Sequence, residues 1–398
     1  MAALTGMRIL DLTQWEAGTS CTQALAWMGA DVVKVEPPGV GDPGRDLNRG
    51  YWEESEYFMN WNANKRSIVI DLRKPEGRQL LIDMLPRFDV LVENYGPGVV
   101  EKLDLGYDVI KAIHPTIIYA QIKGFGLTGP YASYKCFDMV AQSAAGALSI
   151  TGMPDGPPIR PGPTLGDSGT GVQMALAITA AYAQRLRDGI GQHIELAMQE
   201  AVTYYMRTMI ALGAKGGTSV APRIGNDFEP TVRLFPCKPF GANDYVFVMG
   251  VTDPHWKQLC RTIGHPEFID DPRFADSMLR KEHSDALTPV IAAWMAERTK
   301  HEAMHALCEA GIPASATFDT RDLFNDPHLN ERGFIHRFEG EEGGNETALL
   351  GWPARMSESA VPIQLAPALG EHTRSVLGSE LGLEESAIEA LFAQGVVA

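Results

Sequence analysis

Residues 165–171 place one carboxylate among glycines, directly ahead of a long apolar stretch with helical periodicity. The segment runs Leu-Gly-Asp-Ser-Gly-Thr-Gly, and the carboxylate is that of Asp167. Such a group can attack an activated acyl carbon, glycines let a substrate carbonyl approach the main chain, and N–H groups at a helix start can stabilise the resulting oxyanion. Aspartate is also among the commonest helix N-caps. The segment therefore predicts either a nucleophile for acyl transfer or a structural cap.

Two other motifs, one typical of serine hydrolases and one of zinc proteases, have weaker support as catalytic sites. Gly-Asp-Ser-Gly from residue 166 mimics a serine-protease signature and nearly matches the G-x-S-x-G elbow of α/β hydrolases, but Thr170 stands where the elbow needs glycine. A serine hydrolase using Ser168 stays as a minor alternative. His-Glu-Ala-Met-His at 301–305 matches H-E-x-x-H, yet Gly311 occupies the position of the third zinc ligand. We interpret that match as chance and expect no metal site.

The first 36 residues have the βαβ pattern of a nicotinamide-cofactor site but lack its phosphate-binding motif. A strand at 7–13, a helical stretch through 21–27 and a strand at 31–36 form a βαβ unit, and Glu36 ends the second strand where a ribose-binding acid would stand. The turn after the first strand has no G-x-G-x-x-G, however. Trp15 and Glu16 would obstruct and repel a pyrophosphate there. A dinucleotide site is therefore not expected.

Strand-like and helical runs continue to alternate along the chain, which predicts an α/β fold with a mainly parallel sheet. A linker at 213–217 precedes a second region with a hairpin-like piece at 234–250, and a helix at 384–394 closes the chain. The remaining predicted strands are 67–71, 90–93, 117–122 and 193–198, and the remaining predicted helices are 75–88, 172–187 and 198–212.

Length, charge and cysteine content limit the partners. With 398 residues the chain is longer than one hydrophobic core usually supports, so two domains are expected. A formal charge of −16 argues against nucleic acid and anionic membranes. Five scattered cysteines indicate reduced thiols, residues 1–4 lack the features of a signal peptide, and no apolar run has the length of a membrane span. A cytoplasmic protein is expected.

Basic and hydrogen-bonding residues follow the early strands, where open α/β sheets bind their ligands. They would suit the phosphates of a nucleotide-containing ligand, although a solvated surface explains the spacing equally well. The residues are Lys65, Arg66, Arg73, Lys74, Asn94, Tyr95, Lys102 and Lys135.

Seven short segments, in this order and spacing, make nearly the whole chain resemble the family III CoA-transferases. They are DVVKVE at 31–36, GVGD at 39–42, NKRSI at 64–68, VENY at 92–95, KGFG at 123–126, GDS at 166–168 and GEHT at 370–373.

The resemblance implies a large Rossmann-like domain from residues 1–212 and 326–398 and a smaller α+β domain, with linkers, from 213–325. It also implies an interlocked homodimer that uses coenzyme A and acyl-CoA as substrates, without a tightly bound cofactor. Asp167 falls on the family's catalytic aspartate, and Glu16 is implied as a second catalytic residue. The implied CoA contacts are Ala17, Ile70, Asp71, Leu72, Arg73, Asn94, Tyr95, Gly96, Lys102, Lys135, Phe137 and Asp138, with Glu16 beside them.

The implied chemistry moves CoA between acids through an aspartyl anhydride and an aspartyl-CoA thioester on Asp167. Glu16 departs from the family, which often carries glutamine there, so either Glu16 is protonated or backbone N–H groups stabilise the oxyanion. Pro37 replaces a CoA-contacting arginine, which implies that the adenine end is held differently. The histidine of the related acyl-CoA racemases falls on Phe137, which disfavours that alternative.

The acceptor acid is predicted to be larger than oxalate. The glycine-rich loop that closes over the acceptor is shortened to residues 225–229, and the acids Glu16, Asp227 and Glu229 would repel a small dianion. We expect an acceptor with a hydroxyl, amine or aromatic part. A different class of function, a non-catalytic CoA-binding protein in which Asp167 merely caps a helix, stays open at this point.

Overall fold

The computed structural model describes residues 1–47, 55–339 and 347–398. Its contacts divide the chain into two compact units. Unit 1 comprises Met1–Leu148, Arg160–Ala221 and Phe334–Ala398, and unit 2 comprises Ser149–Ile159 and Pro222–Gly333. The small domain predicted at 213–325 differs from unit 2 at both borders and does not include residues 149–159.

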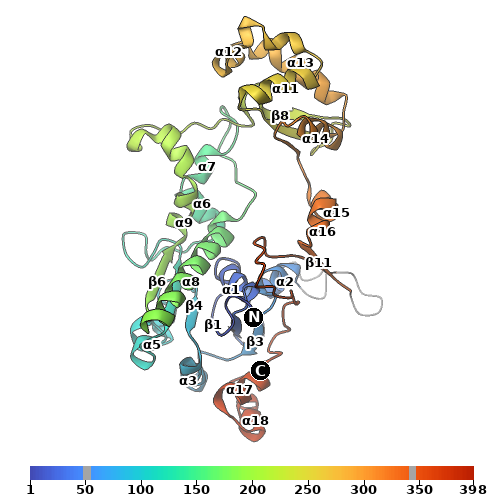
Figure 1. Cartoon of the computed structure of the whole chain (residues 1–398). Coiled ribbons are helices and arrows are strands. Elements are labelled where there is room, and N and C mark those ends of the chain that lie inside the picture. The colour runs from blue at the N-terminus through green and yellow to red at the C-terminus, as the bar shows by residue number, and fades with distance from the viewer. Residues whose placement is uncertain (48–54, 340–346) are drawn as a thin grey trace. The chain divides into compact units, whose positions relative to one another are not determined.

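A six-stranded parallel sheet forms the centre of unit 1, which confirms the predicted α/β class (Figure 1). The predicted strands at 31–36 and 90–93 match the structure residue for residue. The order along the sheet is β3-β2-β1-β4-β5-β6. The strands are β1 (Arg8–Asp11), β2 (Asp31–Glu36), β3 (Arg66–Val69), β4 (Val90–Glu93), β5 (Ile118–Lys123) and β6 (His193–Ala197).

Alternate strand residues face opposite sides of this sheet. Leu10, Val33 and Leu91 join one large apolar cluster with residues of α3, α5, α17 and α18. Ile9 and Val32 point to the other side, where α1 contacts β1, β2 and β4 and packs along α8. The helices of unit 1 begin with α1 (Ala17–Trp27), α2 (Glu56–Asn62), α3 (Pro75–Met84), α4 (Val99–Lys102), α5 (Tyr107–Ile113) and α6 (Asp138–Ala144); after α7 (Ala147–Ile150) follow α8 (Thr170–Asp188), α9 (Met198–Tyr205) and α10 (Arg207–Met209).

The helix predicted at 198–212 is interrupted. Its hydrogen-bond ladder tightens after α9, where the Met206 N–H donates to the Thr203 carbonyl three residues earlier. A separate short helix α10 and a π-helical turn (Ile210–Ala214) follow. The periodicity of the sequence predicted the helical stretch but not this break.

The C-terminal segment returns to the β3 edge of the sheet. In Figure 1 the helices α17 (Thr373–Leu381) and α18 (Glu385–Ala393) lie next to β3. The Val69 N–H donates to the Thr373 hydroxyl at 3.0 Å, and the Asp71 N–H donates to the Val396 carbonyl at 2.9 Å. A two-stranded antiparallel ribbon, β11 (Ile335–Phe338) and β12 (Thr347–Leu350), precedes this segment.

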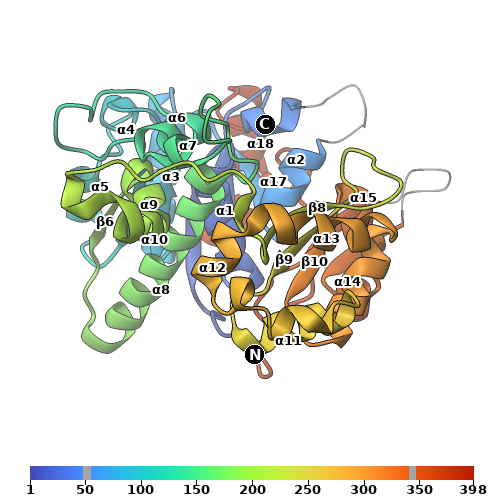
Figure 2. The ribbon, with the colours of Figure 1, turned by 90° about the horizontal axis from the view of Figure 1, so that it is seen from above.

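Unit 2 has its own apolar core between an antiparallel sheet and helices (Figure 2). The sheet order is β10-β9-β8-β7, and the predicted piece at 234–250 forms the β8–β9 hairpin. Its strands are β7 (Asp227–Glu229), β8 (Val232–Pro236), β9 (Tyr245–Met249) and β10 (Ala314–Ala316). Its helices are α11 (Asp253–Thr262), α12 (Ser277–Glu282), α13 (Ser284–Ala296), α14 (Lys300–Glu309), α15 (Thr320–Asn325) and α16 (Pro327–Glu331).

The H-E-x-x-H match at 301–305 lies at the start of α14 and has a structural explanation. Glu302 and Thr299 form a reciprocal capping box at the N-terminus of the helix. Within the described ranges, no group of three or more His, Cys, Asp and Glu side chains is arranged to hold a metal ion. In those same ranges, none of the helices combines the length and apolar character that crossing a membrane requires.

Candidate active site

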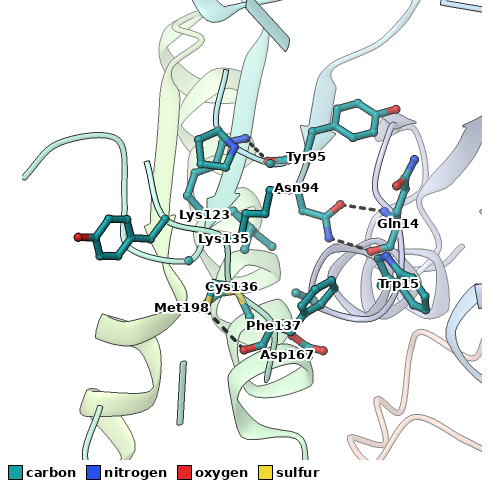
Figure 3. Close-up of a pocket in the computed structure, with 16 residues that line it drawn as sticks. Gln14, Trp15, Asn94, Tyr95, Lys123, Lys135, Cys136, Phe137, Asp167 and Met198 are labelled. Atoms are coloured by element: carbon teal, nitrogen blue, oxygen red, sulfur yellow. Dashed lines mark hydrogen bonds between the residues drawn. The ribbon is translucent and has the colours of Figure 1, made fainter. Parts of the chain in front are cut away.

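The strand order of unit 1 reverses between β1 and β4, which are hydrogen-bonded neighbours. The connections that leave their carboxyl ends therefore run in opposite directions and open a crevice, which is where open α/β sheets bind ligands. A cavity of about 200 Å³ lies there (Figure 3). It is lined by Gln14, Trp15, Ala17, Asn94, Tyr95, Gly96, Pro97, Ile122, Lys123, Gly124, Tyr134, Lys135, Cys136, Phe137, Asp167 and Met198.

Two polar clamps fix the walls of this cavity. The Gln14 N–H donates to the Asn94 amide oxygen and the Asn94 amide donates back to the Gln14 carbonyl, each at 2.8 Å, as Figure 3 shows. Lys123 forms an ion pair with the buried Glu93 at 2.7 Å and also donates to the Tyr95 carbonyl. The loops after β1, β4 and β5 are therefore held together without a ligand.

A network of buried ion pairs supports the loop after β1 from below. Asp11 pairs with Lys65 at 3.1 Å, and Lys34 pairs with Asp42 at 2.8 Å. Lys34 also donates to the Thr13 carbonyl at 2.7 Å, and Asp42 accepts from the Trp15 N–H at 3.1 Å. Because these contacts fix the main chain of residues 13–15, they fix the direction in which the next residue, Glu16, leaves the loop.

Burial and neighbouring charge shift the pKa values inside this network in opposite directions. Burial alone would raise the pKa of Asp11, but Lys65 and Lys34 hold it below its usual value. Burial lowers the pKa of Lys65 to about 8 despite its pairing with Asp11. Asp11 therefore stays an anion, and the network retains its pairing over the neutral pH range.

Asp167 does not cap a helix, so the structural interpretation of this residue is wrong. It lies in a π-helical turn (Leu165–Gly169) that continues directly into α8. The N-cap position of α8 belongs to Gly169, which has helical dihedral angles, and no side chain caps either the turn or the helix. Among the described residues, none donates a hydrogen bond to the Asp167 carboxylate, which is partly exposed in the cavity.

The glycines beside Asp167 allow close packing between elements, while their role in access for a substrate stays a prediction. A Cβ on Gly171 would lie 2.0 Å from the Ser20 hydroxyl and 2.7 Å from the Ala17 carbonyl of α1. A Cβ on Gly166 would lie 2.5 Å from the Asp138 carbonyl. The glycines let the turn that carries Asp167 press against both α1 and the start of α6.

Three carboxylates gather at this turn, and their mutual repulsion shapes the chemistry of Asp167. Burial, then Glu16, then Asp138 raise the pKa of Asp167 to about 7. Asp138 is itself fixed, because its Oδ1 accepts from the Gly166 N–H and from the Gln142 amide, both at 2.8 Å. A carboxyl with a pKa near 7 is a stronger nucleophile, once ionised, than an ordinary aspartate.

Glu16 is almost fully buried, with 4% of its surface exposed. Its Oε1 accepts from the Thr164 hydroxyl, and Tyr57 lies close enough for the carboxylate to raise the pKa of its hydroxyl. Burial raises the pKa of Glu16 above its usual value, against the opposing effect of Thr164. Burial and the nearby carboxylates also raise the pKa of Tyr57, so its hydroxyl stays a donor.

The N-terminus of α1 opens toward the same cavity. Glu16 stands at its N-cap position but makes no side-chain capping bond, and Ala17 begins the helix and lines the cavity. The first N–H groups of a helix have no partner within it and favour an anion in front of them. This helix start can therefore stabilise negative charge that develops next to Asp167.

Comparison with known proteins assigns the chain to a family. The model of CoA-transferase family III matches residues 4–373. The chain belongs to the family III CoA-transferases. A curated relative from Streptomyces avermitilis, named formyl-CoA:oxalate CoA-transferase, is 38% identical over 99% of both chains. A relative of the same name from Rhodopseudomonas palustris is 36% identical over 99% of this chain and 97% of its own.

Solved structures agree on the fold of this CoA-transferase. A CAIB/BAIF family protein from Brucella suis, 30% identical, superimposes over 95% of this chain and 99% of its own with a TM-score of 0.84. A protein from Mycobacterium tuberculosis, 27% identical, covers 94% of this chain and 98% of its own with a TM-score of 0.79. The parallel sheet and its helices are therefore common to the group.

The predicted CoA contacts of the transferase separate into two sets. The first set lines the cavity together with Asp167 and consists of Ala17, Asn94, Tyr95, Gly96, Lys135 and Phe137. The second set does not line it and consists of Ile70, Asp71, Leu72, Arg73, Lys102 and Asp138.

Residues of the second set are paired with other side chains or follow a strand that is distant from the crevice. Residues 70–73 follow β3, which is two strands from β1 and so roughly 10 Å along the sheet. Asp71 is paired with the exposed Arg73 at 2.8 Å. An extended ligand such as CoA would have to leave the cavity along the sheet edge to reach them, so these contacts remain predictions.

Sequence reasoning missed several cavity residues of the transferase. Gln14 and Trp15 lie in the loop after β1, and Tyr134 comes from the segment before α6. Tyr57, whose pKa is raised by Glu16 and Asp167, was also not singled out. One signal was present for Lys123, since a lysine ending an apolar strand needs a buried partner, and Glu93 ends the neighbouring strand.

Two alternatives lose support from the geometry. The Ser168 hydroxyl donates to the Thr164 carbonyl at 3.0 Å, and within the described part of the chain no histidine is bonded to it. Glu36 is buried and accepts two bonds from Arg45, each at 2.7 Å, so it is not free to bind a ribose. Neither a serine hydrolase nor a dinucleotide site matches these contacts.

Proposed function

We propose that this enzyme moves CoA from an acyl-CoA donor to a carboxylic acid acceptor, with Asp167 as the nucleophile. The observation that carries the proposal is the Asp167 carboxylate, which faces the switch-point cavity with a pKa raised to about 7 and accepts no hydrogen bond from the described residues. A structural carboxylate would have a counter-ion or a donor. A nucleophile needs free lone pairs and an approach path.

The proposed steps balance without any redox partner. An Asp167 oxygen attacks the thioester carbonyl, the C–S bond breaks, and CoA leaves as a thiolate. The thiolate then attacks the Asp167 carbonyl carbon of the mixed anhydride, which releases the donor acid and leaves CoA bound to Asp167 as a thioester. The acceptor carboxylate takes over the CoA by the same two steps in reverse, and Asp167 is regenerated.

Two groups can stabilise the oxyanion of each tetrahedral intermediate. The N–H groups at the start of α1 lie beside the cavity, and Glu16, if protonated, donates a hydrogen bond. Burial raises the pKa of Glu16, so this role becomes accessible as the pH falls, whereas the ionised form repels the Asp167 carboxylate. On this proposal Glu16 does the work of the glutamine that other members of the family often carry.

Covalent trapping tests the nucleophile. The enzyme is incubated with acyl-CoA and then with hydroxylamine or borohydride, and the modified peptide is identified by mass spectrometry. Asp167 should be modified, Asp167→Asn should abolish both labelling and transfer, and Ser168→Ala should retain both. An unmodified Asp167 in a preparation that binds acyl-CoA would instead support the non-catalytic alternative.

The remaining features of the proposal concern assembly, domain division and location. We propose that the discontinuous large domain and the small domain act within an interlocked homodimer in the cytoplasm. Exposed Leu176 and Leu186 on α8 and Leu212 beyond it offer apolar surface that a second copy would cover. Light scattering of the purified enzyme gives the mass, and a monomeric mass at all concentrations would refute this part.

The acceptor is proposed to be larger than oxalate, although the curated relatives named above carry formyl-CoA and oxalate in their names. Glu16, whose charge raises the pKa of Asp167, supports this proposal because an ionised Glu16 would also repel a second carboxylate held there. Asp227 is paired with Arg233 at 2.8 Å inside unit 2. Transfer that is fastest to oxalate would refute the proposal.

A further inference from the structure

Thr164 stands at the N-cap position of the π-helical turn that carries Asp167, where a threonine usually caps with its hydroxyl. Its side chain makes no capping bond here. The turn is closed through the Thr164 carbonyl instead, which accepts from the Asp167 N–H at 3.1 Å and from the Ser168 N–H at 2.9 Å. The Thr164 hydroxyl is therefore not needed to begin the turn and is available for another contact.

That contact is with Glu16, which lies 148 residues earlier in the chain. The Thr164 hydroxyl donates to Glu16 Oε1. The Ser168 hydroxyl lies 3.2 Å from the Thr164 hydroxyl and donates to the Thr164 carbonyl at 3.0 Å. Since a hydroxyl has one proton and a carboxylate is the stronger acceptor, the proton of Thr164 points to Glu16.

Glu16 and Asp167 are thus both bonded to Thr164. The Thr164 hydroxyl holds the Glu16 carboxyl, and the Thr164 carbonyl holds the main chain of Asp167. Glu16 is almost fully buried, and among the described residues no lysine or arginine is paired with it. The titratable groups that interact with Glu16 are Asp138, Asp167 and Tyr57. The orientation of the Glu16 carboxyl therefore depends on hydrogen bonds and not on an ion pair.

The bond from Thr164 makes the two oxygens of the Glu16 carboxyl unequal. Because Oε1 accepts from the hydroxyl, the proton of a neutral Glu16 resides on Oε2. In the ionised form the same bond stabilises the negative charge of Glu16, which opposes the rise in its pKa and maintains its repulsion of Asp167. One hydroxyl therefore affects both the direction in which Glu16 donates and its charge.

We propose that Thr164 is a positioning residue of the transfer reaction, whose hydroxyl holds the Glu16 carboxyl so that Oε2 is the oxygen that donates to the oxyanion formed at Asp167. The inference rests on the proposed transfer through Asp167. Thr164 does not line the switch-point cavity, which Asp167 does line (Figure 3). It therefore acts on the reaction through Glu16 and not by contact with a substrate.

Variants at two threonines of the same turn test this inference. Thr164→Val and Thr164→Ala both remove the hydroxyl, and Thr164→Ser keeps it. Thr170→Val is the matched control, because the buried Thr170 hydroxyl donates to the Gly166 carbonyl at 2.6 Å and not to Glu16. Thr164→Val is also combined with Glu16→Gln. The pH dependence of kcat and of kcat/KM is measured with whichever of formyl-, acetyl- or succinyl-CoA serves as donor, together with covalent labelling of Asp167.

Thr164→Val and Thr164→Ala should lower kcat by about tenfold, with KM for acyl-CoA within about twofold, and Thr164→Ser should restore kcat to within about threefold. Without the hydroxyl the Glu16 anion is less stable and repels Asp167 less, so the midpoint of kcat/KM against pH should fall.

The double variant should have the midpoint of Glu16→Gln alone, because no charge remains at Glu16 for Thr164 to stabilise, and Thr170→Val should keep the original midpoint. An unchanged midpoint in both hydroxyl-free variants at Thr164, an equal shift in Thr170→Val, or a further shift in the double variant would overturn the inference. If Asp167 is still labelled in those cases, the proposed function survives without it.

Discussion

Glu16→Gln isolates the electrostatic repulsion that acts on Asp167. Glutamine keeps an oxygen that can accept the Thr164 hydrogen bond, it adds an N–H donor for the oxyanion, and it removes the negative charge of the ionised Glu16 carboxylate. The pKa of Asp167 rises from 3.8 to about 7, and Glu16 ranks behind burial among the causes. It therefore accounts for at most half of the rise, roughly 1.5 pH units.

The expected result is a shift in the pH dependence of kcat/KM for acyl-CoA, which reports groups of the free enzyme. The rate should rise with pH through the pKa of Asp167, because the ionised carboxylate is the nucleophile. In Glu16→Gln the midpoint should fall below 7 by up to about 1.5 units. At pH 6, a fall of one unit would raise the ionised fraction of Asp167 from about one tenth to about one half.

Asp138→Asn is the matched control. Asp138 ranks third among the causes, and asparagine can still accept from the Gly166 N–H. Its midpoint should therefore move in the same direction by a smaller amount, while both variants keep their plateau at high pH within a few-fold. An unchanged midpoint in Glu16→Gln, or a larger shift in Asp138→Asn, would refute the electrostatic reasoning.

Three further changes test stability. Asp167→Asn should stabilise the protein by up to about 4 kcal/mol, and by more at pH 8 than at pH 5. The reason is that the pKa of this carboxyl is higher in the folded than in the unfolded protein, so the folded protein loses stability as the pH rises toward 7. Equal gains at both pH values in chemical denaturation would contradict this. Lys34→Met should cost about 3–5 kcal/mol by leaving Asp42 unpaired, whereas the exposed Lys102→Met should cost less than about 0.5, and similar costs would contradict the buried pairing. Gly171→Ala should lower the melting temperature and the rate together, because its Cβ would meet Ser20 at 2.0 Å; an unchanged rate would separate the packing from catalysis.

The sheet was predictable because its strands are continuous apolar runs bounded by polar residues. The runs at 31–36 and 90–93 match β2 and β4, since strands buried on both faces are mainly apolar, and the one interior charge, Lys34 of β2, is paired with Asp42. The order of the strands was not readable in the same way. Residues 70–73 follow β3 and so miss the cavity, because two strands separate β3 from the reversal point at β1 and β4.

Site residues could be predicted when their chemistry is carried by one short segment of sequence. They could not be predicted when the site is formed by several segments that are distant in sequence. Asp167 stands out through its own neighbours in sequence. Trp15, Tyr134 and Met198 reach the same cavity from three distant segments, and nothing local to any of them indicates the other two. The cap interpretation was wrong for a related reason, since residues 165–169 form a π-helical turn in which Gly166 packs against Asp138 of α6 and Gly169 against Tyr205 of α9.

The carboxylates in this part of unit 1 differ in whether a lysine or arginine is paired with them, and this difference distinguishes structural from reactive groups. Asp11, Asp42, Glu36 and Glu93 are each buried, and each is paired with a lysine or arginine within 3.1 Å. Asp167 has no such partner among the described residues, and its pKa is raised by the charges of Glu16 and Asp138, which have no cationic partner there either. A fold that pairs four buried carboxylates with cations and leaves this group of three acids without one loses stability at neutral pH. The group that costs that stability is the one with free lone pairs facing the cavity, and this links the stabilising effect of Asp167→Asn to its loss of transfer.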